Sequence, residues 1–226
     1  MTGFPRLIPV ADRAILVEFA TVLDDAAHAA VLGLDRALQA DPAPGQRELI
    51  PAYVSLLIGF DPLVTDHAAV RAHAERLLAR PADPAPQAAL RQVQVCYDGD
   101  LAPDLPEVAA RTGLTPEQVI AAHLSGDYRV YMYGFAPGYA YLGGVPPAIR
   151  LDRKPSPLRD IPAGSVIIAG PQCIVTTLTM PTGWWIIGRS PTPILDAGAA
   201  RPFLFDVGDR VQFRRIDRAA WQAAHG

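Results

Sequence analysis

The fold is decided by the segment YRVYMYGFAPGYAYLGG, which runs from residue 128 to residue 144. Its first six residues combine tyrosines with Val130 and predict a strand. Glycines then flank three aromatic residues, Phe135, Tyr139 and Tyr141. Glycine lets a backbone approach a ligand closely while aromatic rings form walls around it. The segment therefore predicts either a ligand-binding loop or a tight barrel turn with aromatic plugs, and composition alone favours neither.

The residues that follow this segment carry a repeated strand signal. Apolar runs alternate with turns rich in Gly and Pro, and the strand candidates are Ser165–Ala169, Cys173–Thr179, Trp184–Gly188, Phe203–Phe205 and Arg210–Arg215. Several short strands at this spacing are typical of a closed or nearly closed β-barrel. The 23 prolines among 226 residues fall mostly between the apolar runs and argue against a helical bundle.

The first 80 residues show a different, mixed pattern. The apolar run within Leu7–Phe19 and the segment Leu49–Phe60 predict strands. Two helices are predicted, one after Asp24-Asp25 and one near residue 66, because apolar residues then repeat on one helical face. These residues are Ala27, Val31, Leu34 and Leu38 in the first helix, and Val70, Ala74 and Leu77 in the second.

A stretch rich in Pro and Ala, residues 81–86, separates the two patterns and is expected to be stiff and extended. We therefore predict an α+β fold with two domains. The first, residues 1–86, is a small α+β domain with this linker, and the second, residues 87–226, is a β-barrel domain. Within the second domain, Thr115, Pro116 and Gln118 form a capping-box pattern that predicts a helix running to about His123.

The composition argues against several classes of function. The net charge of −3 and the pI near 5.9 provide no basic field that would attract a nucleic acid. The N-terminus shows no signal peptide and the sequence holds no apolar span of about 18 residues, so we expect a soluble cytoplasmic protein without a membrane segment. The two cysteines, Cys96 and Cys173, lie far apart and form neither a disulfide framework nor a zinc pattern.

Standard catalytic motifs are missing from the sequence. It contains no GxxxxGK[ST] phosphate loop, no GxGxxG and no GxSxG, and its five histidines form no metal-ligand pair, so no metal site is expected. Taken alone, His123 is more typical of a helix-end histidine favoured by the dipole than of a general base. Arg189 ends an apolar strand and would gain a role by reaching the aromatic loop, where a guanidinium can hold a carboxylate. Because Trp184 and Trp185 point to opposite faces, we expect one ring in the core and the other along a cleft.

The segment at residues 128–144 resembles the block Y-x-V-x-M-x-G-F-x-P-G-F-x-Y-L-G-G of the Kip-inhibitor / allophanate hydrolase subunit 1 family. That family includes the B subunit of bacterial ATP-dependent 5-oxoprolinase. Further blocks of the family recur in the same order, namely Ile50–Leu57 with Asp61-Pro62, Ile161–Val166, Trp184–Pro191, and Gly208-Asp209 with Phe213. His123 matches a histidine just before the barrel. The resemblance covers nearly the whole chain, and its ordered blocks make it specific.

The resemblance implies that the C-terminal barrel is cyclophilin-like and that the chain has a partner, a homologue of subunit 2, which is the C subunit of 5-oxoprolinase. Together with a homologue of the A subunit, such proteins use ATP to open the lactam 5-oxoproline to glutamate, and the ATP need not be bound by this chain. Two alternatives stay open. One is a biotin-dependent amide carboxyltransferase, or allophanate hydrolase subunit 1, and the other is a module that inhibits a histidine kinase by protein contact.

The resemblance also implies a set of site residues. His123 would act in acid–base chemistry, while Gln172 and Arg189 would orient the substrate. The substrate-binding wall would comprise Phe135, Pro137, Gly138, Tyr139, Tyr141, Arg159 and Trp184.

The chain departs from the family pattern in loops that are expected to border the cleft. Leu158 stands where the family commonly has Arg, with Arg159 one place later. Thr176, Thr177 and Thr182 stand where the family commonly has Tyr, Pro and Gly. A lost arginine and tyrosine would change how an anionic or amide substrate is held. The departures therefore raise the hypothesis of a divergent member whose substrate is not 5-oxoproline.

Overall fold

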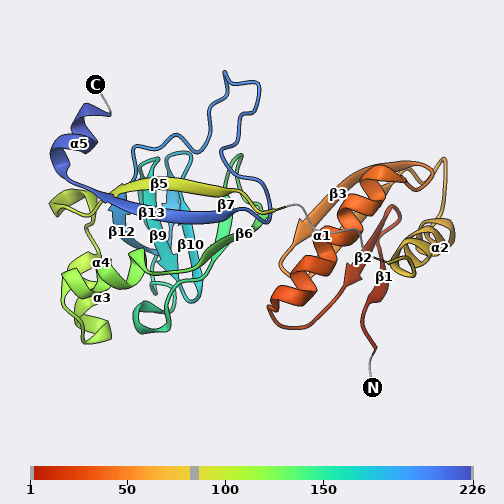
Figure 1. Cartoon of the computed structure of the whole chain (residues 1–226), viewed down its shortest axis with the longest axis horizontal. Helices are drawn as coiled ribbons and strands as arrows, with labels where there is room; N and C mark the ends of the chain where they lie inside the picture. Colours follow the sequence, from red (N-terminus) through yellow and green to blue (C-terminus); the bar gives the residue numbers. More distant parts are fainter. Residues whose placement is uncertain (1–2, 82–86, 225–226) are drawn as a thin grey trace. The chain divides into compact units, whose positions relative to one another are not determined.

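The computed structural model describes residues 3–81 and 87–224. The chain divides into two compact units, Met1–Gln87 and Ala88–Gly226 (Figure 1). Residues 82–86 of the predicted Pro/Ala linker lie outside the described residues. In the described part of the chain, no helix is long and apolar enough to cross a membrane.

The first unit is an antiparallel sheet with two helices packed on one face (Figure 1). Its strands follow the order β1-β2-β4-β3, with β1 at Arg6–Val10, β2 at Ala14–Glu18, β3 at Gln46–Ala52 and β4 at Ser55–Phe60. The two predicted helices are present as α1, Asp25–Ala40, and α2, His67–Leu78. Their apolar stripes share one buried cluster with Ile15, Leu56 and Ile58 of the sheet.

The predicted strand Leu49–Phe60 is wrong as a single strand, because the structure forms a hairpin there. β3 and β4 pair with Ala52 opposite Ser55, so Tyr53-Val54 make a two-residue turn. Neither of these residues is among those that usually mark a turn, which is why the sequence carries no signal for it. Ala11, with a φ of 48°, lies in the turn between β1 and β2, where Val10 pairs with Ala14.

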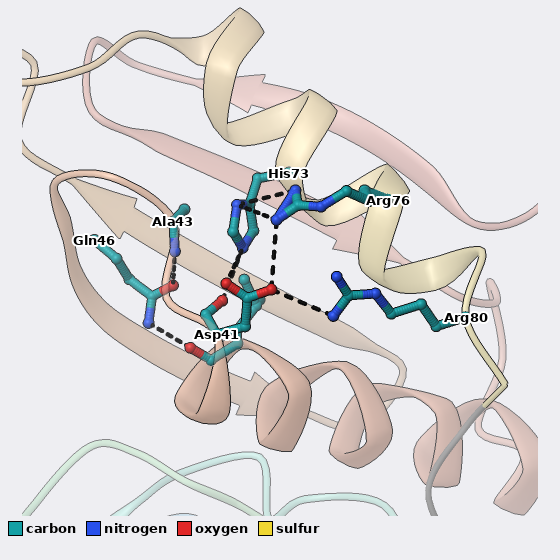
Figure 2. A network of polar contacts seen from close by, with 7 residues as sticks. Asp41, Ala43, Gln46, His73, Arg76 and Arg80 are labelled. Atoms are coloured by element: carbon teal, nitrogen blue, oxygen red, sulfur yellow. Dashed lines mark hydrogen bonds and ion pairs between the residues drawn. The ribbon is translucent and has the colours of Figure 1, made fainter.

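The carboxyl end of α1 is tied to α2 through Asp41 (Figure 2). Asp41 caps α1, and its carbonyl oxygen accepts a hydrogen bond of 2.7 Å from His73 Nε2 on α2. Arg76 donates to His73 Nδ1 at 3.1 Å. The Asp41 carboxylate lies 3.4 Å from Arg76 and 3.3 Å from Arg80. Because His73 uses both ring nitrogens within this cluster, we interpret it as a structural tie between the two helices.

In the second unit, seven strands of the described residues close into a barrel in the order β10-β7-β6-β13-β5-β12-β9 (Figure 1). They are β5 Leu90–Cys96, β6 Tyr128–Tyr133, β7 Ala140–Gly143, β9 Ser165–Ala169, β10 Gln172–Val175, β12 Trp185–Arg189 and β13 Arg210–Ile216. β5 and β13 run parallel, and the other neighbours are antiparallel. The predicted α+β fold with a C-terminal barrel is confirmed.

Helices and a small two-stranded sheet complete the second unit. The helices are α3 Leu105–Thr112, α4 Pro116–Leu124 and α5 Arg218–Ala223, with short 3₁₀ turns at Gly99–Leu101 and Pro147–Ile149. α3 and α4 pack into the same buried cluster as the barrel interior. The predicted capping box is confirmed, because Thr115 and Gln118 each accept a hydrogen bond from the other's backbone amide, at 3.2 and 2.8 Å. The two-stranded sheet pairs β8, Leu158–Ile161, with β11, Met180–Thr182.

Two strand predictions in this unit need correction. The candidate Phe203–Phe205 forms an isolated bridge between Phe203 and Leu195 rather than a strand. Pro202, directly before it, lacks the amide proton that a regular ladder needs. The candidate Cys173–Thr179 ends at Val175, because the next residue, Thr176, bonds into a corner of the barrel.

Strands β9, β10 and β12 are buried on both faces, and this decides where the site lies. Alternate residues such as Ile168 and Cys173 point into the barrel core. The residues between them, such as Ile167 and Ile174, join a second cluster on the outside of the wall. We call this the outer cluster, which consists of Tyr139, Ile161, Ile167, Ala169, Ile174, Trp184 and Ile186. The loop after β6 and the two-stranded β8–β11 sheet therefore cover the barrel wall from outside.

Gly144→Ala should destabilise the barrel strongly, whereas Gly33→Ala should not. Gly144 has a φ of 114°, and a Cβ there would lie 2.1 Å from the Asp127 carbonyl oxygen. We expect a loss of more than about 2 kcal/mol of unfolding free energy. Gly33 lies inside α1 with nothing within 4 Å of its Cβ position, so alanine should stabilise the first unit by about 0.5–1 kcal/mol. Urea unfolding of the two variants measures both effects, and equal stabilities would contradict this account.

Candidate functional site

The loop Gly134–Gly138 joins β6 to β7 and is held from two sides. The backbone amide of Gly134 donates to the carbonyl oxygen of Tyr139 at 3.2 Å, which closes the loop on itself. The hydroxyl of Thr177, just beyond β10, donates to the carbonyl oxygen of Pro137 at 2.7 Å. The loop is therefore fixed both internally and against the neighbouring strand.

Phe135 holds a strained backbone conformation while its side chain stays in solvent. Its φ of 74° lies in the left-handed region, which costs a non-glycine residue about 1–2 kcal/mol. Its ring is 73% exposed. Gly138 also has a positive φ, 70°, and a Cβ there would lie 3.1 Å from Thr177 and 3.3 Å from Phe203. The backbone of this loop is thus shaped to display Phe135 rather than to bury it.

A cavity of about 450 Å³ opens beside this loop. Its walls are Tyr133, Phe203 and residues 134–138, and none of them carries a charged side chain. The hydroxyl of Tyr133 already donates to the carbonyl oxygen of Phe205 at 2.7 Å. Burial raises the pKa of Tyr133, so this hydroxyl stays protonated. The cavity therefore suits an apolar group better than a polar ligand.

Four aromatic rings form a continuous row that starts at the loop. The ring centroids of Phe135 and Tyr139 lie 5.5 Å apart, those of Tyr139 and Tyr141 5.9 Å, and those of Tyr141 and Trp184 6.1 Å. These spacings are typical of favourable contacts between rings. Burial raises the pKa of Tyr139 to about 12. The structure thus brings four of the predicted wall residues together, and we call them the aromatic row. The expectation that one of the two adjacent tryptophans lies along a cleft is wrong, because Trp184 and Trp185 are 5% and 4% exposed.

Arg153 lies at the far end of the aromatic row, although the sequence pattern does not single it out. The central carbon of its guanidinium lies 5.6 Å from the centroid of the Trp184 ring. Its positive charge also acts on Tyr139, where it opposes the rise of the pKa. Within residues 3–81 and 87–224, Arg153 forms no ion pair with a carboxylate. A cation on an aromatic surface without an acidic partner can receive an anionic ligand.

The backbone on both sides of Arg153 is anchored. The carbonyl oxygen of Asp152 accepts a hydrogen bond of 2.7 Å from Trp185 Nε1. The ammonium of Lys154, the single lysine of the chain, lies 2.5 Å from Asp104 Oδ2, and its side chain is 9% exposed. The segment is therefore fixed while the side chain of Arg153 stays exposed. Because the contact between Lys154 and Asp104 joins segments that are distant in the sequence, no local pattern could have revealed it.

Arg189 lies at the end of β12, close to Gly164. Its Nε atom is buried and has no hydrogen-bond partner among the residues that the structure describes. Burial lowers the pKa of this guanidinium, and the charge of Asp100 opposes the shift. Asp100 itself pairs with Arg218. Arg189 does not line the cavity beside the aromatic loop. It is thus a second arginine with unused hydrogen-bonding capacity, at a separate corner of the barrel.

The three threonines at the departures from the family pattern all hydrogen-bond to backbone groups. Thr176 is 1% exposed, and its hydroxyl donates to the carbonyl oxygen of Pro162 at 2.9 Å. Thr177 braces the Gly134–Gly138 loop, as described above. The hydroxyl of Thr182 accepts from the backbone amide of Trp184 at 3.1 Å. Thr177 and Thr182 therefore brace segments that carry the aromatic row, whereas Thr176 braces the turn between β8 and β9.

His123 lies inside the barrel core, with none of its surface exposed. Its Nδ1 lies 2.7 Å from the hydroxyl of Tyr97, and its Nε2 lies 3.6 Å from the sulfur of Cys173. Burial lowers the pKa of His123 to about 3 and raises the pKa of the Cys173 thiol, so both groups are neutral at pH 7. Since His123 is enclosed and both ring nitrogens are engaged, this geometry favours a structural role for it.

The remaining predicted residues do not join the aromatic row. Gln172 begins β10 opposite Gly143, at the end of that strand away from Thr177. Arg159 is exposed on β8 and makes no side-chain hydrogen bond or ion pair within the described ranges. The described residues also contain no group of three or more His, Cys, Asp or Glu side chains that could hold a metal ion.

Comparison with known proteins identifies the family. The model for the carboxyltransferase domain, subdomains C and D, matches residues 5–205, and the chain belongs to this family. The chain is similar to the 5-oxoprolinase B subunit of Bacillus subtilis (strain 168), with 36% identity over 99% of this chain and 98% of that protein. The barrel is of the cyclophilin-like type that the resemblance implied.

Solved structures show the same fold inside longer polypeptides. TTHA0988 matches 91% of this chain with a TM-score of 0.80 and 36% identity, whereas this chain covers 40% of TTHA0988. The urea amidolyase of K. lactis matches 93% of this chain with a TM-score of 0.76, and this chain covers 15% of it. At 16% identity, the likeness to urea amidolyase is one of fold alone.

Acid should destabilise the barrel through His123. Its pKa is about 3 in the folded protein and about 6.5 in the unfolded chain, so between these values the unfolded chain alone binds this proton. The contribution of neutral His123 to stability is therefore complete above pH 6.5 and falls by about 1.4 kcal/mol per pH unit as the pH drops toward 3. Urea unfolding at several pH values, followed by tryptophan fluorescence, measures this loss of barrel stability, because all three tryptophans lie in residues 88–226.

The matched variants are His123→Gln and His67→Gln. His123→Gln should lower stability at pH 7. Its unfolding should take up one proton fewer, so its stability should depend less on pH between about 5 and 6.5. His67→Gln, in the first unit, should leave the slope of the barrel transition unchanged. An unchanged slope in His123→Gln would show that His123 is not the group that takes up the proton.

Proposed function

We propose that this chain is the B subunit of a 5-oxoprolinase-type complex, which uses ATP to hydrolyse the lactam 5-oxoproline to glutamate. The observation that carries the proposal is the 36% identity to a 5-oxoprolinase B subunit over nearly the full length of both chains. The partners in the proposal are homologues of the C subunit, also called subunit 2, and of the A subunit. The cofactor is ATP, which the complex uses in the cytoplasm.

The surface at the end of the aromatic row supports a role in binding a small, flat anion. 5-Oxoproline has a planar lactam group and one carboxylate. The half-buried ring of Tyr141 is inclined at 71° to the ring of Trp184, which is itself 5% exposed, so Tyr141 supplies most of the accessible apolar surface here. Arg153 lies over the same Trp184 and has a guanidinium that can hold a carboxylate through two hydrogen bonds. We therefore assign substrate binding to this surface, with Arg189 as a second candidate cation.

The reaction breaks the ring C–N bond of the lactam, adds the hydroxyl of water to the carbonyl carbon and leaves an amine. The coupling to ATP supplies the free energy that drives the opening of the lactam ring. The aromatic row contains no carboxylate, histidine or thiol that could act as a base, and His123 is enclosed in the core. We therefore propose that the reacting groups and the ATP site belong to the partner proteins.

The length of TTHA0988 supports a close association with a second protein region. This chain covers 40% of TTHA0988, so the matched region is joined to further polypeptide there. The biotin-dependent carboxyltransferase and the histidine-kinase inhibitor remain alternatives, and no described contact favours either. The hypothesis of a substrate other than 5-oxoproline also stays a prediction.

Co-expression with the homologues of the A and C subunits tests the proposal. The purified complex should release glutamate from 5-oxoproline with ATP, and the release should vanish when this chain is omitted. A stable complex that releases no glutamate would contradict the proposed substrate and direct attention to other amides or to carboxyl transfer. Failure to form any complex would contradict the proposed membership of a complex and favour the kinase-inhibitor alternative.

Arg153→Gln should raise the KM for 5-oxoproline by about 10- to 100-fold with little change in kcat, because a charge-assisted hydrogen bond to the carboxylate contributes about 1.5–3 kcal/mol. Arg189→Gln tests the second cation in the same way. Arg214→Gln removes the same charge from an exposed position on β13 and should leave KM unchanged. A KM effect in Arg153→Gln that is equalled by Arg214→Gln would indicate a loss of general charge rather than of a specific contact.

A further inference from the structure

We propose that the Gly134–Gly138 loop is a docking surface for the partner protein, with Phe135 inserting into the partner and the adjacent cavity receiving an apolar side chain in return. The partner is the protein that corresponds to the part of TTHA0988 outside the match. The inference rests on the proposed function to the extent that such a partner exists. It assigns Phe135, Pro137 and Gly138 to contact with protein rather than with substrate.

The first argument is that the display of Phe135 is not explained by folding. Its φ of 74° is unfavourable for a phenylalanine, and its ring is 73% exposed. Its ring contact within the described residues is with Tyr139, so little apolar surface is buried in exchange. The hydrogen bonds from Gly134 and Thr177 hold the loop in this shape. Strain that is maintained by the surroundings and leaves an aromatic ring in solvent points to a function outside the folded chain.

The second argument is the chemistry of the cavity. Its walls are uncharged, and the Tyr133 hydroxyl is committed to the carbonyl oxygen of Phe205. A lactam that carries a carboxylate would lose its hydration there without gaining a charged partner. An apolar side chain of a protein has no hydrated charge to lose when it enters the cavity. The cavity therefore fits a protein partner better than it fits the proposed substrate, whose anion is matched by Arg153 instead.

The third argument is the surface around the loop. Phe203, which lines the cavity, is 38% exposed, and Leu178, next to the bracing Thr177, is 44% exposed. Beyond Phe203, Arg201 and Asp206 form an exposed ion pair with a nitrogen–oxygen distance of 2.5 Å. An aromatic anchor with a pocket beside it, apolar neighbours and charged groups farther out is the usual anatomy of a protein interface.

The fourth argument concerns the occupant. In TTHA0988, a region similar to this chain is covalently joined to a longer stretch of polypeptide. This chain instead covers 98% of the Bacillus subtilis relative, so that relative has the length of the matched region alone. A contact that TTHA0988 forms within one molecule would form by association in a protein of that length. A preorganised aromatic anchor lowers the entropic cost of such an association. We therefore commit to this partner rather than to a second copy of the chain.

The experiment measures the affinity between the purified chain and its purified C-subunit homologue by calorimetry. Phe135→Gly and Phe135→Asn both remove the ring, and both residues tolerate a positive φ. We expect each to raise Kd at least 30-fold while the Tm of the isolated chain stays the same or rises. Val22→Asn, at a position in the first unit that is 72% exposed, is the matched control and should leave Kd unchanged. A Kd within threefold of the native value in both Phe135 variants would overturn the inference.

Activity of the complex separates docking from substrate binding. If Phe135 docks the partner, a large excess of partner should restore the glutamate release of Phe135→Gly with a normal KM. If Phe135 instead forms the substrate wall, KM would stay high at any partner concentration, and the inference would be wrong. The native chain could instead fail to bind the C-subunit homologue and self-associate through Phe135. That result would assign the surface to a second copy and would also overturn the inference. An active complex in which Phe135 variants bind normally leaves the proposed function intact and refutes this inference alone.

Discussion

Burial of β9, β10 and β12 on both faces is the constraint on which the candidate site depends. Residues such as Ile168 fill the barrel, while their neighbours, such as Ile167, face outward and would be exposed without a cover. The aromatic loop and the two-stranded β8–β11 sheet provide that cover through Tyr139 and Ile161. Hydrophobic burial on the outside of the barrel thus fixes the backbone of these segments. It also places the aromatic row where its edge can meet solvent.

Two surfaces of different polarity result from this arrangement. Beside Phe135, the cavity walls carry no charged side chain, and the hydroxyl of Tyr133 is already paired with the carbonyl oxygen of Phe205. At the other end of the aromatic row, Arg153 presents a charge without an acidic partner in the described part of the chain. Desolvation makes these surfaces selective for different ligands, because an anion gains at the second and loses at the first. This difference is the basis of our proposal that one surface docks a partner and the other binds the substrate.

The departures from the family pattern have a physical interpretation in the structure. Thr176, Thr177 and Thr182 each form a hydrogen bond to the backbone, and those of Thr177 and Thr182 lie on segments that carry the site. Short side chains with a hydroxyl can brace a loop without filling the space in front of it. In this chain these positions therefore shape the loops, and under the proposed function the anion would be recognised by arginines on other segments.

Local patterns in the sequence determined the strand-rich second half, the capped helix before the barrel and the importance of the aromatic loop, because strand alternation, capping and turn chemistry depend on near neighbours. They missed the Tyr53-Val54 turn, which has no typical turn residue. The tertiary structure alone decided that Arg153 lies on Trp184, that His123 is enclosed in the core, and that Gln172 begins β10 at the end away from the loop. These placements depend on strand register and on which face each segment covers, and neither property is carried by a single stretch of sequence.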